Sequence, residues 1–355
     1  MSVEIGVIEG FFGRPWTWAE RTANVSFLGP RGYGFWLYAP KADPYLRRRW
    51  REPYPDAELQ ALKAFGAACR EADVRFGVGL TPFELHFGFD TAAKVALSAK
   101  LAQLDDAGVE DLAILFDDMR GDLPDLAARQ AEIVHWIGPR TKASRLIMCP
   151  SYYSDDPVLD RVFGQRPSTY LAELGIALEP VVHVMWTGEE VCSLEYSAGH
   201  LERVGQQLRR RPFLWDNYPV NDGPRMSQHL HLRAFTGRPA SIGAHLSAHA
   251  VNPASQPVLT RIPMLTLAES YARGEGYQYL AAFRRAAETV LGEPLARQVT
   301  ADLLTLQDTG LDRFSDERKA ALVARYQAYD HPAAREIVDW LQGGYAITGE
   351  ALQTQ

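Results

Sequence analysis

Eight short apolar runs recur along the chain at intervals of roughly thirty to forty residues, the length of a strand followed by a helix. Most of them are rich in Val, Ile, Leu and Phe without alternation, which is typical of parallel strands buried on both faces. Because eight such strands close a (β/α)8 TIM barrel, the spacing predicts an α/β fold of this architecture. The predicted strands are residues 4–8, 34–38, 75–80, 112–116, 145–149, 181–186, 212–215 and 241–246.

Helical patterns fill the intervals between these runs and continue beyond the last one. The segment 16–32 is the least regular, because Gly29 and Pro30 interrupt it. No strand pattern follows residue 276, so we predict a barrel domain over residues 1–273 and a small C-terminal α-helical domain over 274–355. The other predicted helical segments are 56–72, 91–107, 125–136, 156–174, 201–210, 225–236, 254–273, 277–291, 294–306, 316–329 and 332–341.

Composition limits the classes of function. The apolar fraction of 46% with 11% aromatic residues is ample for a packed core. A formal net charge of −7 argues against a nucleic-acid or anionic-membrane partner, and no apolar run has the length of a membrane span. The 3 cysteines are widely spaced without a C-x-x-C pair, which argues against a disulfide framework or a structural zinc site. We expect a cytoplasmic protein, since the N-terminus lacks a signal-peptide pattern. We also expect the protein to use no metal and no cofactor.

The stretch D-L-A-I-L-F-D-D puts two adjacent carboxylates, Asp117 and Asp118, directly after the fourth predicted strand. Taken alone, such residues more often cap the following helix or begin a turn. In a closed barrel, however, the carboxyl ends of all strands meet at one mouth, where the loops form the pocket. We therefore expect these two carboxylates to share a site with the polar residues that follow the other strands.

The other strand ends supply amides, aromatic rings, a Lys and further carboxylates. Carbohydrate suits this inventory best, because the C–H faces of a sugar pack on Trp and Tyr rings while its hydroxyls need paired donors and acceptors. Plainer interpretations stay open for several of these residues. Gly10 can serve a tight turn or the close approach of a ligand, and Lys41 can lie on the surface. Tyr153 and Trp215 can pack at the rim of the core.

Six motifs stand in order along the predicted barrel: G-V-I-E-G-F-F-G-R-P-W, L-Y-A-P-K-A-D-P-Y, L-F-D-D-M, C-P-S-Y-Y, W-T-G-E-E-V and W-D-N-Y-P-V-N-D. In this order they resemble the motifs of glycoside hydrolase family 84. That family holds the O-GlcNAcases, or β-N-acetylglucosaminidases, and proteins once described as hyaluronidases. The resemblance runs from Val3 to Asn252, essentially the whole predicted barrel.

The resemblance implies a retaining exo-β-N-acetylglucosaminidase that removes terminal β-linked GlcNAc by substrate-assisted catalysis. In that scheme the acetamido oxygen of the substrate attacks the sugar and gives an oxazoline intermediate. By position in the motif, Asp117 would orient and polarise the acetamido N–H. Asp118 would be the general acid that protonates the leaving oxygen, and then the base that activates water. Two close carboxylates repel, so one of them is expected to keep a proton near neutral pH.

Motif position also implies contacts with the sugar hydroxyls. Gly10, through its backbone carbonyl, and Lys41 look like two such contacts of the family. Asp222 would accept from the hydroxyls at the far side of the sugar. Asn252 resembles the family's last hydroxyl-binding Asn.

Three further residues resemble those that surround the acetamido group in the family. Tyr153 corresponds to a Tyr near the acetamido pocket, and Trp215 to the apolar wall of that pocket. Asn217 resembles the amide that supports the acetamido group and Asp117. Phe12 stands where the family often has Tyr, and it has no assigned role.

Two alternatives to this hydrolase are considered. A non-catalytic GlcNAc-binding barrel would keep the pocket, but such a protein would be expected to have lost one of the two adjacent aspartates. A barrel glycosidase with two separated carboxylates would use one of them as its own nucleophile. The expected partner is a GlcNAc-bearing glycoprotein or glycan, with the natural aglycone left open. The apolar stripes of the C-terminal helices predict a bundle core, with a homodimer contact as the alternative.

Overall fold

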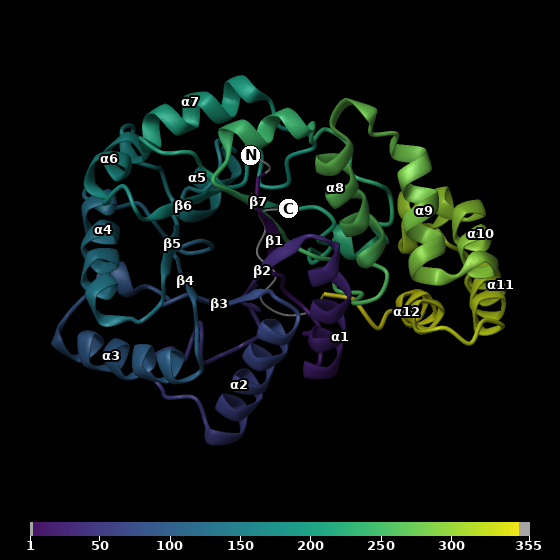
Figure 1. The fold of residues 1–355 in the computed structure, drawn as a ribbon, viewed down its shortest axis with the longest axis horizontal. Helices are drawn as coiled ribbons and strands as arrows, with labels where there is room; N and C mark the ends of the chain where they lie inside the picture. The colour runs from purple at the N-terminus through teal and green to yellow at the C-terminus, as the bar shows by residue number, and fades with distance from the viewer. Residues whose placement is uncertain (1–2, 348–355) are drawn as a thin grey trace.

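The computed structural model describes residues 3–347, in which eight parallel strands close into a barrel (Figure 1). Each strand is hydrogen-bonded to the next in sequence order, and the last pairs with the first. The predicted (β/α)8 fold is therefore confirmed. The strands are β1 (Ile5–Glu9), β2 (Tyr33–Tyr38), β3 (Arg75–Leu80), β4 (Asp111–Leu115), β5 (Arg145–Cys149), β6 (His183–Trp186), β7 (Phe213–Asp216) and β8 (Ala248–Val251).

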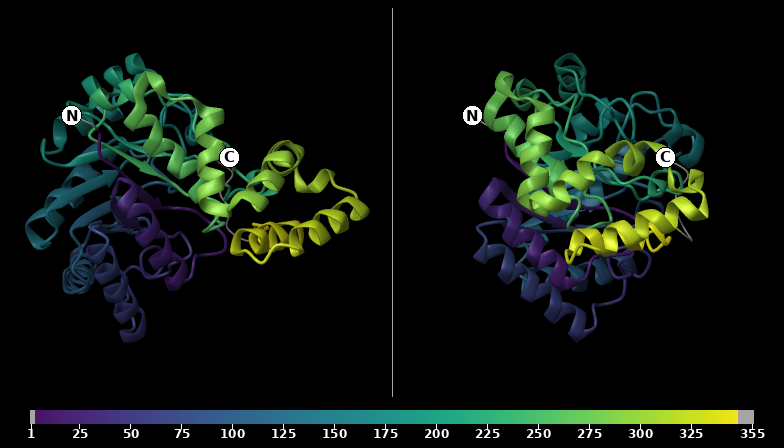
Figure 2. Two further views of the ribbon diagram at one scale, coloured as in Figure 1. Left: turned by 45° about the vertical axis from the view of Figure 1, so that its right-hand side comes forward. Right: turned by 90° about the vertical axis from the view of Figure 1, so that its right-hand side faces the viewer.

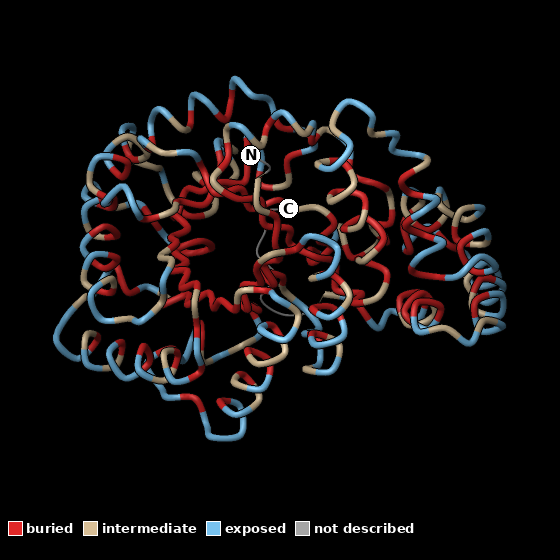
Figure 3. The backbone as a smooth tube through the Cα atoms, viewed as in Figure 1, coloured by how far each residue is buried: buried red, intermediate tan, exposed pale blue. Residues whose placement is uncertain are grey.

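Helices surround the strands and bury their outer faces. Ala113 and Ile114 of β4 point to opposite faces and have no exposed surface, as expected for a strand that is buried on both faces. Figure 3 shows the strands as buried, with exposed residues along the outer sides of the helices. The helices of this layer are α1 (Trp18–Leu28), α2 (Asp56–Glu71), α3 (Thr91–Asp106), α4 (Leu126–Ile137), α5 (Val158–Phe163), α6 (Tyr170–Ala177), α7 (Ala198–Leu208) and α8 (Arg261–Arg273).

Helix α1 lies in the least regular predicted segment, and a local motif explains why it forms. The hydroxyl oxygen of Thr17 accepts the Glu20 N–H at 3.2 Å, and the Glu20 carboxylate accepts the Thr17 N–H at 2.6 Å. This capping box satisfies two backbone donors that the helix itself cannot pair. The interruption at Gly29 and Pro30 is a single 3-10 turn after the helix.

The predicted eighth strand at residues 241–246 is wrong. This segment forms a 3-10 helix (Ala240–His245), and the strand that closes the barrel is Ala248–Val251. Ile242 and Leu246 are indeed buried, but they pack in a small cluster with α7 instead of pairing with β7 and β1. The apolar character of a short segment shows that it is buried and does not distinguish a strand from a helical turn.

The predicted helix at residues 225–236 is also wrong. The segment has one 3-10 turn (Met226–Gln228) and then runs without regular structure. Leu230 and Leu232 are both buried against the C-terminal helices, which is the alternating pattern of an extended chain. The side-chain oxygen of Gln307 accepts the Leu232 N–H at 2.9 Å, so distant residues satisfy backbone groups that a helix would have paired.

One predicted helix, residues 156–174, is divided in two. Its parts are α5 and α6, and the chain between them contains Gly164, with φ +90°, and Pro167. A left-handed φ ends the first helix, and proline disfavours helical geometry in the residue before it. The carboxylate of Asp160 accepts the Arg166 N–H at 2.8 Å and holds this turn.

The helices beyond the barrel lie together at one side of it (Figure 2). Their existence was predicted, although the second of them ends at Ala301 and is followed by a π-helical turn (Thr305–Thr309). The division into domains at residue 273 stays a prediction. None of the helices within residues 3–347 is long and apolar enough to cross a membrane. The C-terminal helices are α9 (Tyr279–Leu291), α10 (Glu293–Ala301), α11 (Asp316–Gln327) and α12 (Pro332–Leu341).

Polar contacts join these helices to the loops of the barrel. The carboxylate of Glu336, on α12, accepts the N–H groups of Val258 and Leu259 at 2.8 and 2.9 Å. Trp340 of the same helix donates its indole N–H to the Ser227 carbonyl at 3.0 Å. These contacts hold α12 against the loops that precede and follow β8.

Candidate active site

A pocket opens at the carboxyl ends of the barrel strands. All of the site residues predicted from the sequence line this pocket, together with four that were not assigned to it. The predicted residues are Gly10, Lys41, Asp117, Asp118, Tyr153, Trp215, Asn217, Asp222 and Asn252, and the additional ones are Phe12, Cys149, Thr187 and Val191.

Asp117 and Asp118 follow β4 and share one cation. Lys41, from the loop after β2, forms an ion pair with Asp117, and its Nζ lies 3.5 Å from Oδ2 of Asp118. Tyr153, from the loop after β5, donates its hydroxyl to Oδ1 of Asp118 at 3.0 Å. All four side chains are buried. The two carboxylates are therefore held by groups from two other strand ends.

The backbone at Asp118 turns sharply. Its φ is +56°, in the left-handed region that residues other than glycine rarely adopt. Because the strand does not continue, the two adjacent carboxylates face one pocket instead of opposite sides of the sheet. Arg47 donates from Nη2 to the Asp118 carbonyl at 3.4 Å and supports the turn. Unfavourable backbone geometry of this kind is concentrated at functional sites.

The charges in the pocket act on one another. Burial raises the pKa of Asp118, and the charge of Asp117 adds to this, while Lys41 opposes it. Burial alone would lower the pKa of Lys41, but the two carboxylates outweigh it, so the pKa of the ammonium is raised. The Oδ1 atom of Asp117 is buried and has no hydrogen-bond partner among the described residues. This oxygen can therefore accept from a ligand.

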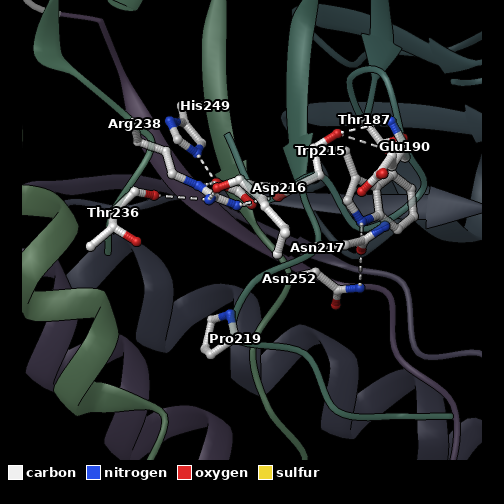
Figure 4. Close-up of polar contacts among 12 residues, drawn as sticks. Thr187, Glu190, Trp215, Asp216, Asn217, Pro219, Thr236, Arg238, His249 and Asn252 are labelled. Atoms are coloured by element: carbon white, nitrogen blue, oxygen red, sulfur yellow. Dashed lines mark hydrogen bonds and ion pairs between the residues drawn. The ribbon is translucent and has the colours of Figure 1, made fainter. Parts of the chain in front are cut away.

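A chain of amide contacts forms another wall of the pocket (Figure 4). Oδ1 of Asn217 accepts from the Trp215 indole N–H and from Nδ2 of Asn252, both at 2.9 Å. Nδ2 of Asn217 donates to the Val191 carbonyl at 2.7 Å. Asn252 in turn accepts the Gly10 N–H at 3.2 Å. The ends of β7, β8 and β1 are thereby tied together.

Gly10 allows the chain to approach Trp215 closely. A Cβ atom at this position would lie under 3.0 Å from the ring, and the φ of Gly10 is not in the left-handed region. Gly10 therefore lies against the Trp215 ring, and its N–H also donates to the Ile8 carbonyl at 2.9 Å in a tight turn, while the close approach of a ligand stays a prediction. Nearby, Asp222 accepts the Phe12 N–H at 2.8 Å, which joins the loop after β7 to the loop after β1.

Two of the additional residues carry a signal in the sequence. Cys149 is the last residue of β5 and Thr187 follows β6 directly, so both stand at strand ends. Burial raises the pKa of the Cys149 thiol well above its usual range, so the thiol is a neutral part of the lining. Phe12 and Val191 lie further along their loops, where strand position gives no guidance. Within residues 3–347, no cluster of His, Cys, Asp and Glu could hold a metal ion.

Comparison with known proteins identifies the family. The model of the β-N-acetylglucosaminidase family matches residues 5–308, which is most of the chain. The chain belongs to the β-N-acetylglucosaminidase family. This result confirms the resemblance to glycoside hydrolase family 84 that the motifs indicated.

The proteins that this chain resembles include a mammalian protein and two solved structures. The protein O-GlcNAcase of Mus musculus is 31% identical over 280 residues, which are 75% of this chain and 30% of the mouse protein. An aspartate-to-asparagine mutant of the Thermobaculum terrenum O-GlcNAc hydrolase has a TM-score of 0.77 and 28% identity, over 96% of this chain and 74% of that one. The solved structure of CpGH84B has a TM-score of 0.73 and 28% identity, over 92% of this chain and 57% of that one. The chain thus spans 30% of the length of the curated relative it matches.

Proposed function

We propose that the protein is a retaining exo-β-N-acetylglucosaminidase that removes terminal β-linked GlcNAc, as an O-GlcNAcase does, through an oxazoline intermediate. Membership of the β-N-acetylglucosaminidase family supports hydrolysis of GlcNAc linkages. The pocket supports the mechanism. It lies at one end of a closed barrel, and the polar groups that line it converge from several strand ends on one space, which suits a single terminal sugar unit.

One observation carries the proposal, namely the arrangement of Asp117. One of its oxygens pairs with the Lys41 ammonium, while the other is buried and has no hydrogen-bond partner among the described residues. An anchored acceptor of this kind suits an amide N–H, such as that of an acetamido group. A hydrogen bond from the acetamido N–H to Asp117 makes the carbonyl oxygen more nucleophilic and holds it in line for attack.

The two chemical steps share Asp118. In the first step the acetamido oxygen forms a bond to the anomeric carbon, the glycosidic bond breaks, Asp118 gives its proton to the leaving oxygen, and the amide proton passes to Asp117 to leave a neutral oxazoline. In the second step Asp118 takes a proton from water, which attacks the same carbon and opens the oxazoline, while the nitrogen takes its proton back from Asp117. A raised pKa caused by burial supports the acid role, and the hydroxyl donated by Tyr153 supports the carboxylate in the base role.

The sugar hydroxyls are assigned to polar groups around the two aspartates. Lys41 has a further N–H to donate besides those directed at the carboxylates, and Asn252 keeps a second N–H beyond its contact with Asn217. Asp222 and the backbone carbonyl of Gly10 supply acceptors. All four line the same pocket as the two aspartates.

The acetamido methyl group is assigned to the recess formed by Tyr153, Trp215 and Asn217. Trp215 is 4% exposed and is held by its indole N–H, so its ring is a rigid apolar surface. The substrate class, a GlcNAc-bearing glycoprotein or glycan, belongs to this proposal. The cytoplasmic location and a homodimer through the C-terminal helices stay predictions from the sequence.

Hydrolysis of an aryl β-N-acetylglucosaminide, followed by NMR of the released sugar, tests the proposal. We expect the β-anomer to appear first, because two inversions at the anomeric carbon give net retention. A thiazoline mimic of the oxazoline should inhibit, and a 2-fluoro sugar that traps an enzyme nucleophile should leave the protein unlabelled. A labelled carboxylate would contradict substrate assistance. Binding of GlcNAc without turnover would instead indicate a sugar-binding barrel.

A further inference from the structure

A buried charged cluster lies directly behind the pocket wall. Its centre is Asp216, the last residue of β7, which stands between Trp215 and Asn217 in the sequence. Figure 4 shows Arg238 and His249 on one side of Asp216 and the two pocket residues on the other. This is the alternation expected at the end of a strand. None of these three residues, Asp216, Arg238 and His249, lines the pocket described above.

Arg238 uses every N–H group of its guanidinium. Nε and Nη2 donate to the two carboxylate oxygens of Asp216 at 2.9 and 2.7 Å. Nη2 also donates to the Ser193 carbonyl at 2.8 Å, and Nη1 donates to the carbonyls of Leu194 and Thr236. Because a lysine has a single ammonium in place of the planar fork, it cannot reproduce this set of contacts.

These contacts join the end of β7 to the loop after β6. That loop also carries Val191, whose carbonyl accepts from Asn217 in the pocket wall. The loop is therefore held at one point by a pocket residue and at another by Arg238. Gly237 allows the chain to pack closely against the loop beside Arg238, because a Cβ there would lie under 3.0 Å from the Leu194 carbonyl oxygen. The N–H of Tyr196 donates to the Gly237 carbonyl at 2.9 Å.

The carboxylate of Asp216 has a further anchor on β8. Nε2 of His249 lies 3.0 Å from Oδ2 of Asp216, and Nδ1 of His249 lies 2.8 Å from the Tyr271 hydroxyl of α8. Burial alone would raise the pKa of Asp216, but Arg238 and His249 outweigh it and lower the pKa to about 2. The charge of Asp216 is thus stabilised by its partners, and the ion pair with Arg238 is part of the folded structure.

We propose that Arg238 is a positioning residue, which fixes the acetamido recess by clamping the end of β7 to the loop after β6. This inference rests on the proposed function, since it takes Trp215 and Asn217 as the walls of that recess. Arg238 touches no substrate. Its effect is on the width of the recess, and therefore on the discrimination between short and long N-acyl groups.

The test compares two thiazolines, derived from N-acetyl- and N-butanoyl-glucosamine, in calorimetric binding to the wild type and to Arg238→Lys. We expect the variant to bind the acetyl compound about 10-fold to 100-fold more weakly, the range that corresponds to losing an apolar contact of about one methylene in a pocket. The butanoyl compound should lose much less, so the ratio of the two affinities falls. Asp216→Asn, which keeps the size of the side chain, should lower the ratio in the same way and serves if the first variant does not fold.

Arg145→Lys is the matched control. Arg145 also pairs with a buried aspartate, Asp111, but at the opposite ends of the strands, where no pocket residue lies. Arg145→Lys should lower the stability of the protein and leave the ratio of the affinities for the acetyl and butanoyl compounds unchanged. An unchanged ratio in Arg238→Lys and Asp216→Asn would overturn the positioning role and leave the proposed function intact. A wild type that binds neither thiazoline would refute the proposed function, and the positioning role with it.

Discussion

At the scale of single residues, Gly10 is a pocket position that has no space for a side chain. Its Cα faces the Trp215 ring, and any side chain there would enter the ring. Its N–H is committed to Asn252, so the backbone cannot move without disturbing the amide chain that also holds Asn217. The position of the indole ring on β7 thus depends on the absence of a Cβ atom at Gly10, which follows β1 on the far side of β8.

We predict that Gly10→Ala destabilises the protein by about 1–3 kcal/mol, the usual effect of overpacking a well-packed site. It should also lower kcat/KM on an aryl N-acetylglucosaminide, because the indole ring has to move. Urea unfolding and steady-state kinetics provide the two measurements. Gly199→Ala on α7 is the control, since a Cβ there meets nothing within 4 Å. Equal behaviour of the two variants would contradict the argument.

The sequence predicts most of the site because strand ends in a barrel converge, so the residues that follow the strands can be assigned to one pocket. Lys41, Asp117 and Tyr153 are examples. The roles of these residues came from the resemblance to a family and not from their spacing. Val191 could not be predicted, because its place in the pocket depends on the course of a loop that distant residues such as Arg238 hold.

At the scale of elements, seven strands were predicted close to their observed bounds and the eighth was placed too early in the chain. The real β8 is only four residues long, A-H-A-V, and its composition does not distinguish it from the 3-10 segment before it. Its strand conformation is imposed by pairing with β7 and β1 on both sides. Pairing with neighbours is a tertiary effect that a local pattern does not contain. Helix α1, in contrast, has a local signal in its capping box.

We predict that Thr17→Ala lowers the free energy of unfolding by about 0.5–2 kcal/mol, because the Glu20 N–H loses its cap. Thr17→Ser keeps the hydroxyl and should recover most of the loss. Thr17 and its partner Glu20 lie outside the pocket, so kcat/KM of both variants should stay at the wild-type value. Chemical denaturation of the two variants gives the comparison, and a Thr17→Ala midpoint equal to that of the wild type would refute the capping role.

At the scale of the whole molecule, Glu336 links the C-terminal helices to the barrel. Glu336 is 8% exposed, and its carboxyl group accepts two backbone N–H groups next to α8. Burial raises the pKa of Glu336 to about 8, although these two N–H groups oppose the shift. The folded protein therefore binds this proton more tightly than the unfolded chain, whose Glu has a pKa near 4.5.

It follows that stability contributed through Glu336 is greatest in acid and is lost as the pH rises from about 4.5 to about 8. The loss is at most about 1.4 kcal/mol per pH unit, the linkage of one proton. Glu336→Gln cannot titrate, so the wild type should lose stability relative to this variant between pH 5 and pH 8. Thermal unfolding at several pH values measures the difference. A constant difference across this range would contradict the raised pKa.

The central claim is that Asp117 and Asp118, adjacent in the sequence and held by one lysine, divide the work of a substrate-assisted hydrolysis. It is tested most directly with aryl β-N-acetylglucosaminides of high and low leaving-group pKa, given to the wild type, Asp117→Asn and Asp118→Asn. Asp118→Asn should lose about 10²–10⁴-fold in kcat/KM on the poor leaving group and far less on the good one, which needs no protonation. Asp117→Asn should fail on both. Equal losses on the two substrates in Asp118→Asn would contradict the account.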